Sequence, residues 1–252
     1  MKYKKLLVSG CSFTENHNSW AYYLASKYNL ELINLAVQGA GNNHIVWSLL
    51  SYIEKNQIDP ETTLVGIMWS HPIRDDLVFE QNTMYSDQSI FKYKYDNANS
   101  LVIRGDLLKR GLPQLYLNLE VAKEKLQTRE NQSSIAFRTW TLKTSLTAYL
   151  ANKKFNFFQT GFLNYFNESI LIKTNTNWDF QKTFSYFKEL DRIGLSSKLS
   201  NWLNLTDHEY LGEYAFYKNL LDQDKFHPNQ TGHEQWSNEI LIPKLIELKI
   251  IS

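Results

Sequence analysis

The chain of 252 residues is 43% hydrophobic and 21% charged, a composition typical of a globular protein with an apolar core. Its formal net charge of +1 gives no global electrostatic reason to expect nucleic acid or an anionic membrane as a partner. A single cysteine excludes an intrachain disulfide framework and, with no apolar run near the roughly 20 residues that span a bilayer, favours a cytoplasmic protein.

The first apolar run, residues 5–9, predicts a buried β-strand that leads directly into Gly10, Cys11 and Ser12. The letters VSGC within this segment also match a lipoprotein-processing pattern that follows a basic start. A signal segment, however, needs about 7–15 apolar residues before the cysteine, and here only residues 6–8 are available. We therefore interpret the segment as the end of a strand.

The following segments alternate between helix and strand. Residues 19–28 and 42–56 carry apolar residues at helical spacing, and residues 32–35, 63–69 and 155–159 are typical of short buried strands. The alternation with short connections places the chain in the α/β class. It predicts a flavodoxin-like, three-layer α/β/α arrangement in which helices cover both faces of a mainly parallel sheet.

The middle of the chain is less regular. Residues 75–112 are polar and lack a clear period, which predicts an irregular excursion over the functional face, and two helical patterns follow within residues 113–152. Residues 162–220 are typical of helix and loop. Because no segment resembles a flexible linker, we expect one domain over residues 1–252, in which an irregular or helical insertion within 75–220 caps the functional face.

The last segment, residues 230–249, predicts a helix. Its start, Thr231-Gly232-His233-Glu234, matches a capping box in which Thr231 would cap the helix. Pro243 lies inside the pattern and predicts a kink, because proline cannot donate the backbone hydrogen bond of a helix.

Two segments far apart in the sequence together suggest nucleophilic chemistry. Ser12 lies just beyond the first predicted strand, at the edge where ligands bind in open parallel sheets. Asp224 precedes His227 by three residues in a loop, so its carboxylate can reach the δ nitrogen of that histidine. A serine hydroxyl needs a base, and the base needs a carboxylate to hold its tautomer. Asp222 is an alternative partner whose spacing fits less well.

Other chemistries have weaker support. Cys11 could act as nucleophile, but beside Ser12 on a sharp turn its side chain is expected to point into packing. The nucleophile elbow of the α/β-hydrolases needs Gly-x-Ser-x-Gly, and Thr14 stands at its last position.

No metal or cofactor is expected. His227 and His233 lack a zinc spacing, and we interpret His233 as a residue of the surface or beside the site. Residues 39–43 open a helix and could hold a phosphate, but they lack dinucleotide-binding or Walker spacing.

Three segments resemble the sequence blocks of the SGNH (GDSL-type) hydrolases. The letters GCSFT, residues 10–14, are similar to the first block, in which the serine is the nucleophile. The letters NLAVQGAGNNHI, residues 34–45, resemble the second block, where a glycine backbone N–H helps to form the oxyanion hole; Gly39 is the matching position. The letters DKFHP, residues 224–228, resemble the final Asp-x-x-His block. The resemblance implies the SGNH hydrolase fold and a triad of Ser12, His227 and Asp224.

The third block of the family, Gly-x-Asn-Asp, is changed here. Residues 66–74 read GIMWSHPIR and contain no asparagine to donate to the oxyanion, a version that resembles a divergent branch with a Trp-Ser/Thr-x-x-x-Arg block. Ser70, Asn42 or Asn43 could donate in its place. Arg74 could bind an anionic substrate group, although a surface or ion-pair role is equally open.

These features predict a serine esterase that hydrolyses an O-acyl ester. The resemblance to the family, together with the 15 Tyr and 7 Trp of the chain, implies in particular an O-acetyl ester on a carbohydrate. The expected partner is a small-molecule or oligosaccharide ester. Two alternatives stay open for the same fold: a catalytically weak or inactive carbohydrate-binding protein, and an acyltransferase with the same triad. A phosphate or nucleotide binder at residues 39–43 is a further reading.

Overall fold

The computed structural model describes residues 2–70, 75–80, 92–95, 98–103, 132–161, 201–203, 205–206, 208–224 and 227–251. Its helices are α1 (Ser12–Glu15), α2 (Trp20–Tyr28), α3 (Asn42–Asn56), α6 (Gln132–Asn152), α9 (Leu211–Tyr217), α10 (Gln230–Trp236) and α11 (Ile242–Glu247). Its strands are β1 (Lys5–Ser9), β2 (Glu31–Asn34), β3 (Thr63–Trp69), β4 (Asp75–Glu80), β5 (Lys92–Tyr95), β6 (Ala98–Ile103) and β7 (Asn156–Gly161). In the part of the chain described, no helix is both long and apolar enough to cross a membrane.

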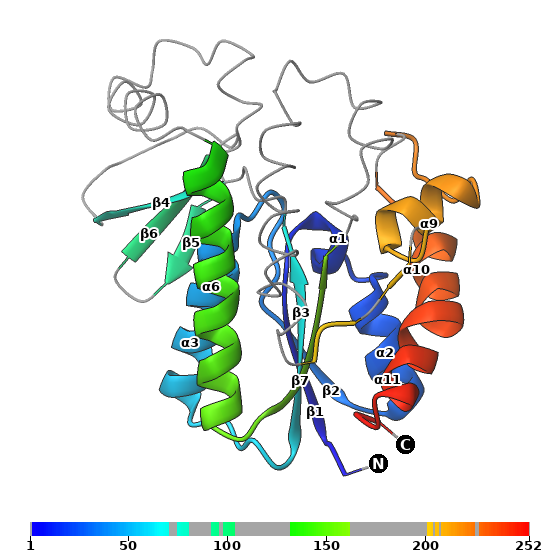
Figure 1. Cartoon of the computed structure of the whole chain (residues 1–252), viewed down its shortest axis with the longest axis horizontal. Helices are drawn as coiled ribbons and strands as arrows, with labels where there is room; N and C mark the ends of the chain where they lie inside the picture. Colours follow the sequence, from blue (N-terminus) through cyan, green and yellow to red (C-terminus); the bar gives the residue numbers. More distant parts are fainter. Residues whose placement is uncertain are drawn as a thin grey trace.

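The main sheet has the strand order β2-β1-β3-β7, and every neighbouring pair is parallel. Helices α3 and α6 lie on one side of it, and α2, α10 and α11 lie on the other (Figure 1). The predicted three-layer α/β/α arrangement is confirmed. Because the strands are parallel, their carboxyl ends meet at one edge, which is where the loops that carry the site begin.

Alternate residues of the central strands face the two helical layers, as the period of a strand requires. Toward α2, α10 and α11 the buried residues include Leu6, Val8, Leu64, Met68, Trp20, Leu24, Trp236 and Leu245. Toward α3 and α6 they include Leu7, Val65, Ile67, Trp69, Ile45, Leu49, Leu146 and Leu150. The two clusters hold the sheet rigidly between the layers, so the strand ends at the site have a fixed geometry.

Gly66 lets large aromatic side chains approach the middle of β3. A Cβ atom at this position would lie 2.8 Å from Cζ of Phe158 and 3.1 Å from Cη2 of Trp20. The Trp20 ring meets the Phe158 ring edge-on, with ring centroids 5.8 Å apart. The absent side chain therefore allows the first residue of α2 to anchor that helix on the sheet.

The structure corrects the interpretation of residues 75–112 as irregular. Strands β4, β5 and β6 form a second, antiparallel sheet in the order β4-β6-β5, with β4 paired to β6 from Asp75↔Ile103 to Glu80↔Ala98. The strands contain β-branched, aromatic and leucine side chains, which favour extended pairing, but polar neighbours hide a regular period.

Of the two helices predicted for the middle of the chain, one can be compared with the structure. The second helical pattern of residues 113–152 is confirmed as α6, whereas the first lies outside the described residues, as do residues 162–200. The single-domain organisation and the capping role of the insertion stay predictions.

The C-terminal helix begins at a different cap from the one predicted. Asn229 is the N-cap, and its side chain accepts a hydrogen bond from the backbone N–H of Gly232 at 2.8 Å. Thr231 already lies inside α10, so the capping-box prediction is wrong by two residues.

The kink expected near Pro243 appears as a π-helical turn over residues 237–241, between α10 and α11. The N–H of Ile242 donates to Ser237 O, five residues back, just before the proline that has no N–H to offer.

Candidate active site

Ser12 begins α1 at the carboxyl end of β1, after a turn that only glycine permits. A Cβ atom on Gly10 would lie 2.4 Å from Oγ1 of Thr14 and 3.1 Å from Met68 O. The N–H groups of Thr14 and Glu15 donate to Cys11 O at 2.8 and 3.1 Å, which closes the turn. The hydroxyl of Ser12 is thereby presented at the strand edge.

The neighbours of Ser12 face the protein interior. Cys11 is fully buried in the apolar core, so its side chain packs as expected. The Phe13 ring lies against the imidazole of His227, with ring centroids 5.1 Å apart. Thr14 accepts a hydrogen bond from Nε1 of Trp20 at 3.1 Å. Ser12, in contrast, lines a pocket.

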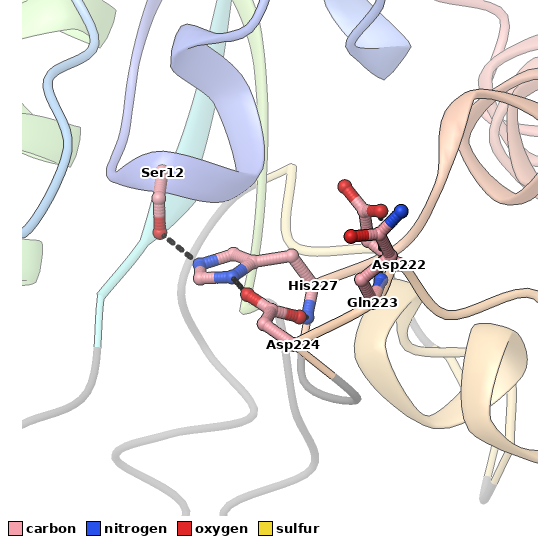
Figure 2. Close-up of polar contacts among 5 residues, drawn as sticks. All are labelled: Ser12, Asp222, Gln223, Asp224 and His227. Carbon is pink, nitrogen blue, oxygen red and sulfur yellow. Dashed lines mark hydrogen bonds and ion pairs between the residues drawn. The ribbon is translucent and has the colours of Figure 1, made fainter.

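Ser12, His227 and Asp224 form a continuous series of hydrogen bonds (Figure 2). Oγ of Ser12 lies 2.8 Å from Nε2 of His227, across 215 residues of sequence. Nδ1 of His227 contacts Oδ2 of Asp224, and the other oxygen of that carboxylate accepts the backbone N–H of His227 at 2.9 Å. The carboxylate thus holds both the ring and the backbone of the histidine.

Asp222, the alternative partner, does not contact the imidazole. Its backbone N–H donates to His227 O at 2.7 Å, and its carboxylate accepts the N–H of Gln223 at 2.7 Å. Asp222 therefore shapes the loop, while Asp224 pairs with the histidine.

Hydrogen bonds hold both ends of the loop that carries His227. Asn229 donates its backbone N–H to Leu220 O at 2.8 Å and its side-chain amide to Leu221 O at 3.3 Å. Leu221 and Pro228 form an isolated antiparallel bridge. Since Asn229 also caps α10, the position of His227 depends directly on where that helix begins.

Gly39 lies in the loop between β2 and α3, next to the turn that carries Ser12. Its φ of 80° is in the left-handed region that favours glycine. The loop is attached to the turn because the N–H of Val37 donates to Gly10 O at 3.2 Å. Asn34 adds a second attachment, from its Nδ2 to Thr14 O at 2.7 Å.

Asn42 reaches from the start of α3 to the end of β3. Its Oδ1 accepts the backbone N–H of Ser70 at 2.9 Å, and this bond assigns the amide orientation. The residue is 2% exposed, and its Nδ2 is buried with no hydrogen-bond partner among the residues that the structure describes. A buried donor without a partner is rare in a folded protein. Asn42 therefore places an unused amide N–H beside the strand end where the third-block asparagine is absent.

Three further residues were predicted to contribute to the site: Ser70, Asn43 and Arg74. Ser70 is fully buried at the end of β3, and Asn43 is half-buried in the first turn of α3. Arg74 lies outside the described residues, so its predicted contact with a substrate anion stays a prediction.

A pocket of about 410 Å³ opens beside Ser12. Its described lining is almost entirely polar and consists of Ser12, Glu15, Asn16, His17, Gln38, Asp222, Asp224, His227, Pro228 and His233. Three segments distant in sequence thus supply one cavity: the segment after β1, the loop after β2, and the loop before α10 together with the first turn of that helix.

His233 lies beside the site, which is one of the two positions that the sequence left open for it. It is 3% exposed, so it does not belong to the surface. Burial, and secondarily the charge of His227, lowers its pKa from 6.5 to about 4. Its spacing from Trp236, one helical turn on, was the available signal, because residues three apart share a helix face.

No protein-family model matches the chain, and no curated protein sequence matches it either. Solved structures with a similar fold include the psychrotrophic esterase EstA from Pseudoalteromonas sp., with a TM-score of 0.51, 14% identity and coverage of 98% of both chains. LAE5, an alpha/beta hydrolase enzyme from the metagenome of Lake Arreo, has a TM-score of 0.50 and 12% identity over 96% of this chain and 94% of its own. TesA has a TM-score of 0.50 and 11% identity over 97% of this chain and 99% of its own. The fold that the resemblance to the SGNH hydrolases predicts is thereby confirmed.

Proposed function

We propose that this protein is a serine esterase that hydrolyses O-acyl esters with Ser12 as nucleophile, His227 as base and Asp224 as the residue that orients the base. The observation that carries the proposal is the hydrogen-bond series from Ser12 through His227 to Asp224. The similar fold of the esterase EstA is consistent with it.

The proposed reaction has two halves. Oγ of Ser12 attacks the ester carbonyl carbon while its proton passes to Nε2 of His227, and the tetrahedral intermediate expels the alkoxide, which takes that proton. A water molecule then attacks the acyl-enzyme, giving its proton to the same nitrogen, and the carboxylic acid leaves as Ser12 regains its proton. Asp224 keeps Nδ1 protonated, so Nε2 is free to accept.

The developing oxyanion needs donors that are already in position. The backbone N–H groups of Ser12 and Gly39 are the first two in this proposal. Nδ2 of Asn42 is the third, because it is a buried, unpartnered donor whose amide is held by Ser70. In this proposal Asn42, the first residue of α3, takes the role of the asparagine that the family has in its third block.

We further propose an O-acetyl ester of a carbohydrate as the substrate. The polar lining of the pocket supports a carbohydrate as the alcohol part of the ester, since lipid alcohols prefer apolar walls. The pocket volume of about 410 Å³ is sufficient for a sugar unit.

The test is turnover of p-nitrophenyl acetate together with fluorophosphonate labelling located by mass spectrometry. Ser12→Ala is expected to lower kcat by about 10⁴-fold or more and to abolish labelling. Cys11→Ala is the matched control on the adjacent residue, and it should keep the label on Ser12.

Absence of turnover and labelling in a folded wild-type protein would favour the non-catalytic alternative and refute the proposal. Transfer is distinguished from hydrolysis by comparing acetate release with acetylation of an added sugar. Dominant sugar acetylation would assign the same residues to an acyltransferase.

A further inference from the structure

His233 is a buried polar residue for which the fold gives no account. It lies in the first turn of α10, is 3% exposed and lines the same pocket as Ser12 and His227. Within the described part of the chain, its buried Nδ1 has no hydrogen-bond partner. A methionine or leucine would fill this space without burying an unpaired nitrogen, so packing alone does not explain an imidazole here.

The charge state of His233 limits what it can do. Its lowered pKa, about 4, keeps the imidazole neutral at pH 7. A neutral imidazole offers one hydrogen-bond donor and one acceptor, which suits a hydroxyl group that can both donate and accept. At pH 7 His233 therefore adds no second charge near His227.

The proposed reaction assigns the leaving group to this pocket. In the proposed reaction His227 returns a proton to the departing alkoxide, so the alcohol oxygen must lie beside its Nε2. The walls here come from His227, Asp222 and His233. The space they enclose is therefore the one that the alcohol part of the ester occupies.

The other lining residues indicate what kind of alcohol fits. Glu15, Asn16, Gln38 and Asp222 line the pocket, and their carboxylate and amide oxygens are acceptors for hydroxyl donors. Among the described lining residues there is no lysine or arginine. A hydroxyl-rich alcohol without negative charge matches this wall better than an anionic one.

We propose that His233 is a substrate-binding residue that holds a hydroxyl group of the alcohol part of the ester against the buried wall of the pocket. The inference rests on the proposed esterase function and assigns the alcohol as hydroxyl-rich and not anionic.

The experiment compares two acetate esters in wild type, His233→Met and His233→Gln. The ester 6-O-acetylglucose has a hydroxylated alcohol part, whereas the alcohol part of p-nitrophenyl acetate has no further hydroxyl. His233→Met should lower kcat/KM for the sugar ester about 5- to 10-fold, mainly through KM, because one hydrogen bond is lost. The loss for p-nitrophenyl acetate should be smaller, so that the ratio of the two kcat/KM values changes, and His233→Gln should recover part of the loss on the sugar ester.

Ser237→Ala is the matched control. Ser237 is buried on the next turn and donates to His233 O at 2.7 Å, yet it is outside the pocket lining. This variant should lose stability without discriminating between the two esters. If His233→Met does not fold, competition in wild type decides: methyl glucoside should inhibit p-nitrophenyl acetate turnover competitively.

Several outcomes would overturn the inference alone: equal losses on both esters, no loss on the sugar ester, no inhibition by methyl glucoside, or a wild type that cleaves p-nitrophenyl acetate but not the sugar ester. A wild type that cleaves neither ester and takes no fluorophosphonate label would overturn the proposed function as well.

Discussion

Asp222 and Asp224 lie two residues apart in one loop, but only Asp224 contacts the imidazole of His227. We expect Asp224→Asn to lower kcat by roughly 10³- to 10⁴-fold, because the amide no longer holds the required tautomer. Asp222→Asn keeps a side-chain acceptor for the N–H of Gln223 and should leave kcat within a few-fold. Steady-state kinetics on p-nitrophenyl acetate measure both. Equal losses would mean that the carboxylates act only on the loop.

The two polar atoms of the Asn42 side chain have different roles in the proposal: Oδ1 accepts the N–H of Ser70, and Nδ2 donates to the oxyanion. One substitution can therefore remove the donor alone. Asn42→Asp keeps an oxygen for the N–H of Ser70 but removes the donor, so kcat should fall by about 10²- to 10³-fold with little change in KM. Ser48→Ala is the matched control, because Ser48 lies on the same helix as Asn42. It removes a buried hydrogen bond of 2.9 Å between the hydroxyl groups of Ser48 and Ser9. This control should lose about 1 kcal/mol of stability and keep kcat. A wild-type kcat in Asn42→Asp would exclude Asn42 from the oxyanion site.

At the scale of the element, the start of α10 sets the position of the base. Asn229 caps the helix and also holds Leu220 and Leu221, so the loop between these points, which contains Asp224 and His227, has both ends attached. A change in the cap is therefore expected to affect activity as well as helix stability.

Substitutions at Asn229, the observed cap, and at Thr231, the cap that the capping-box pattern predicted, distinguish the two helix starts. Asn229→Ala should cost about 1–2 kcal/mol in the free energy of unfolding and reduce kcat, while Asn229→Asp restores much of both. Thr231→Ala should change neither by much, because Thr231 lies inside the helix. Urea denaturation and ester turnover provide the readouts. A larger effect at Thr231 than at Asn229 would contradict the observed helix start.

For the whole molecule, the buried His44 links stability to pH. Burial lowers its pKa from 6.5 to about 4, and a hydrogen bond to the backbone of Leu35 opposes this shift. Between these two pH values the unfolded chain binds more protons than the folded one at this residue, so stability falls as the pH falls through this window.

His44→Gln removes this titration. Between pH 7 and pH 5, the wild type should lose about 2 kcal/mol more of its free energy of unfolding than the variant does. Urea denaturation at both pH values measures the difference. Identical pH dependence in the two proteins would show that folding does not change the pKa of His44.

Much of the architecture could be predicted because its signals are local. The helix over residues 42–56 and the strand over residues 63–69 were predicted with the boundaries that the structure has, since their apolar residues repeat at the period of the element. The antiparallel strands of residues 75–103 were missed because pairing between strands, and not a burial period, defines them. The cap of α10 was misassigned because Asn229 and Thr231 are both residues that favour a helix start.

By itself, the sequence determined the α/β fold class, Ser12 at a strand end and the Asp-x-x-His spacing of Asp224 and His227. These depend on period, turn chemistry and short spacing, which are written along the chain. Only the tertiary structure decided that Asp224 and not Asp222 meets the imidazole, that Asn42 reaches Ser70, and that His233 lines the pocket. The reason is physical: parallel strands bring the loops of distant segments to one edge, and the contacts made there depend on side-chain directions that no local pattern records.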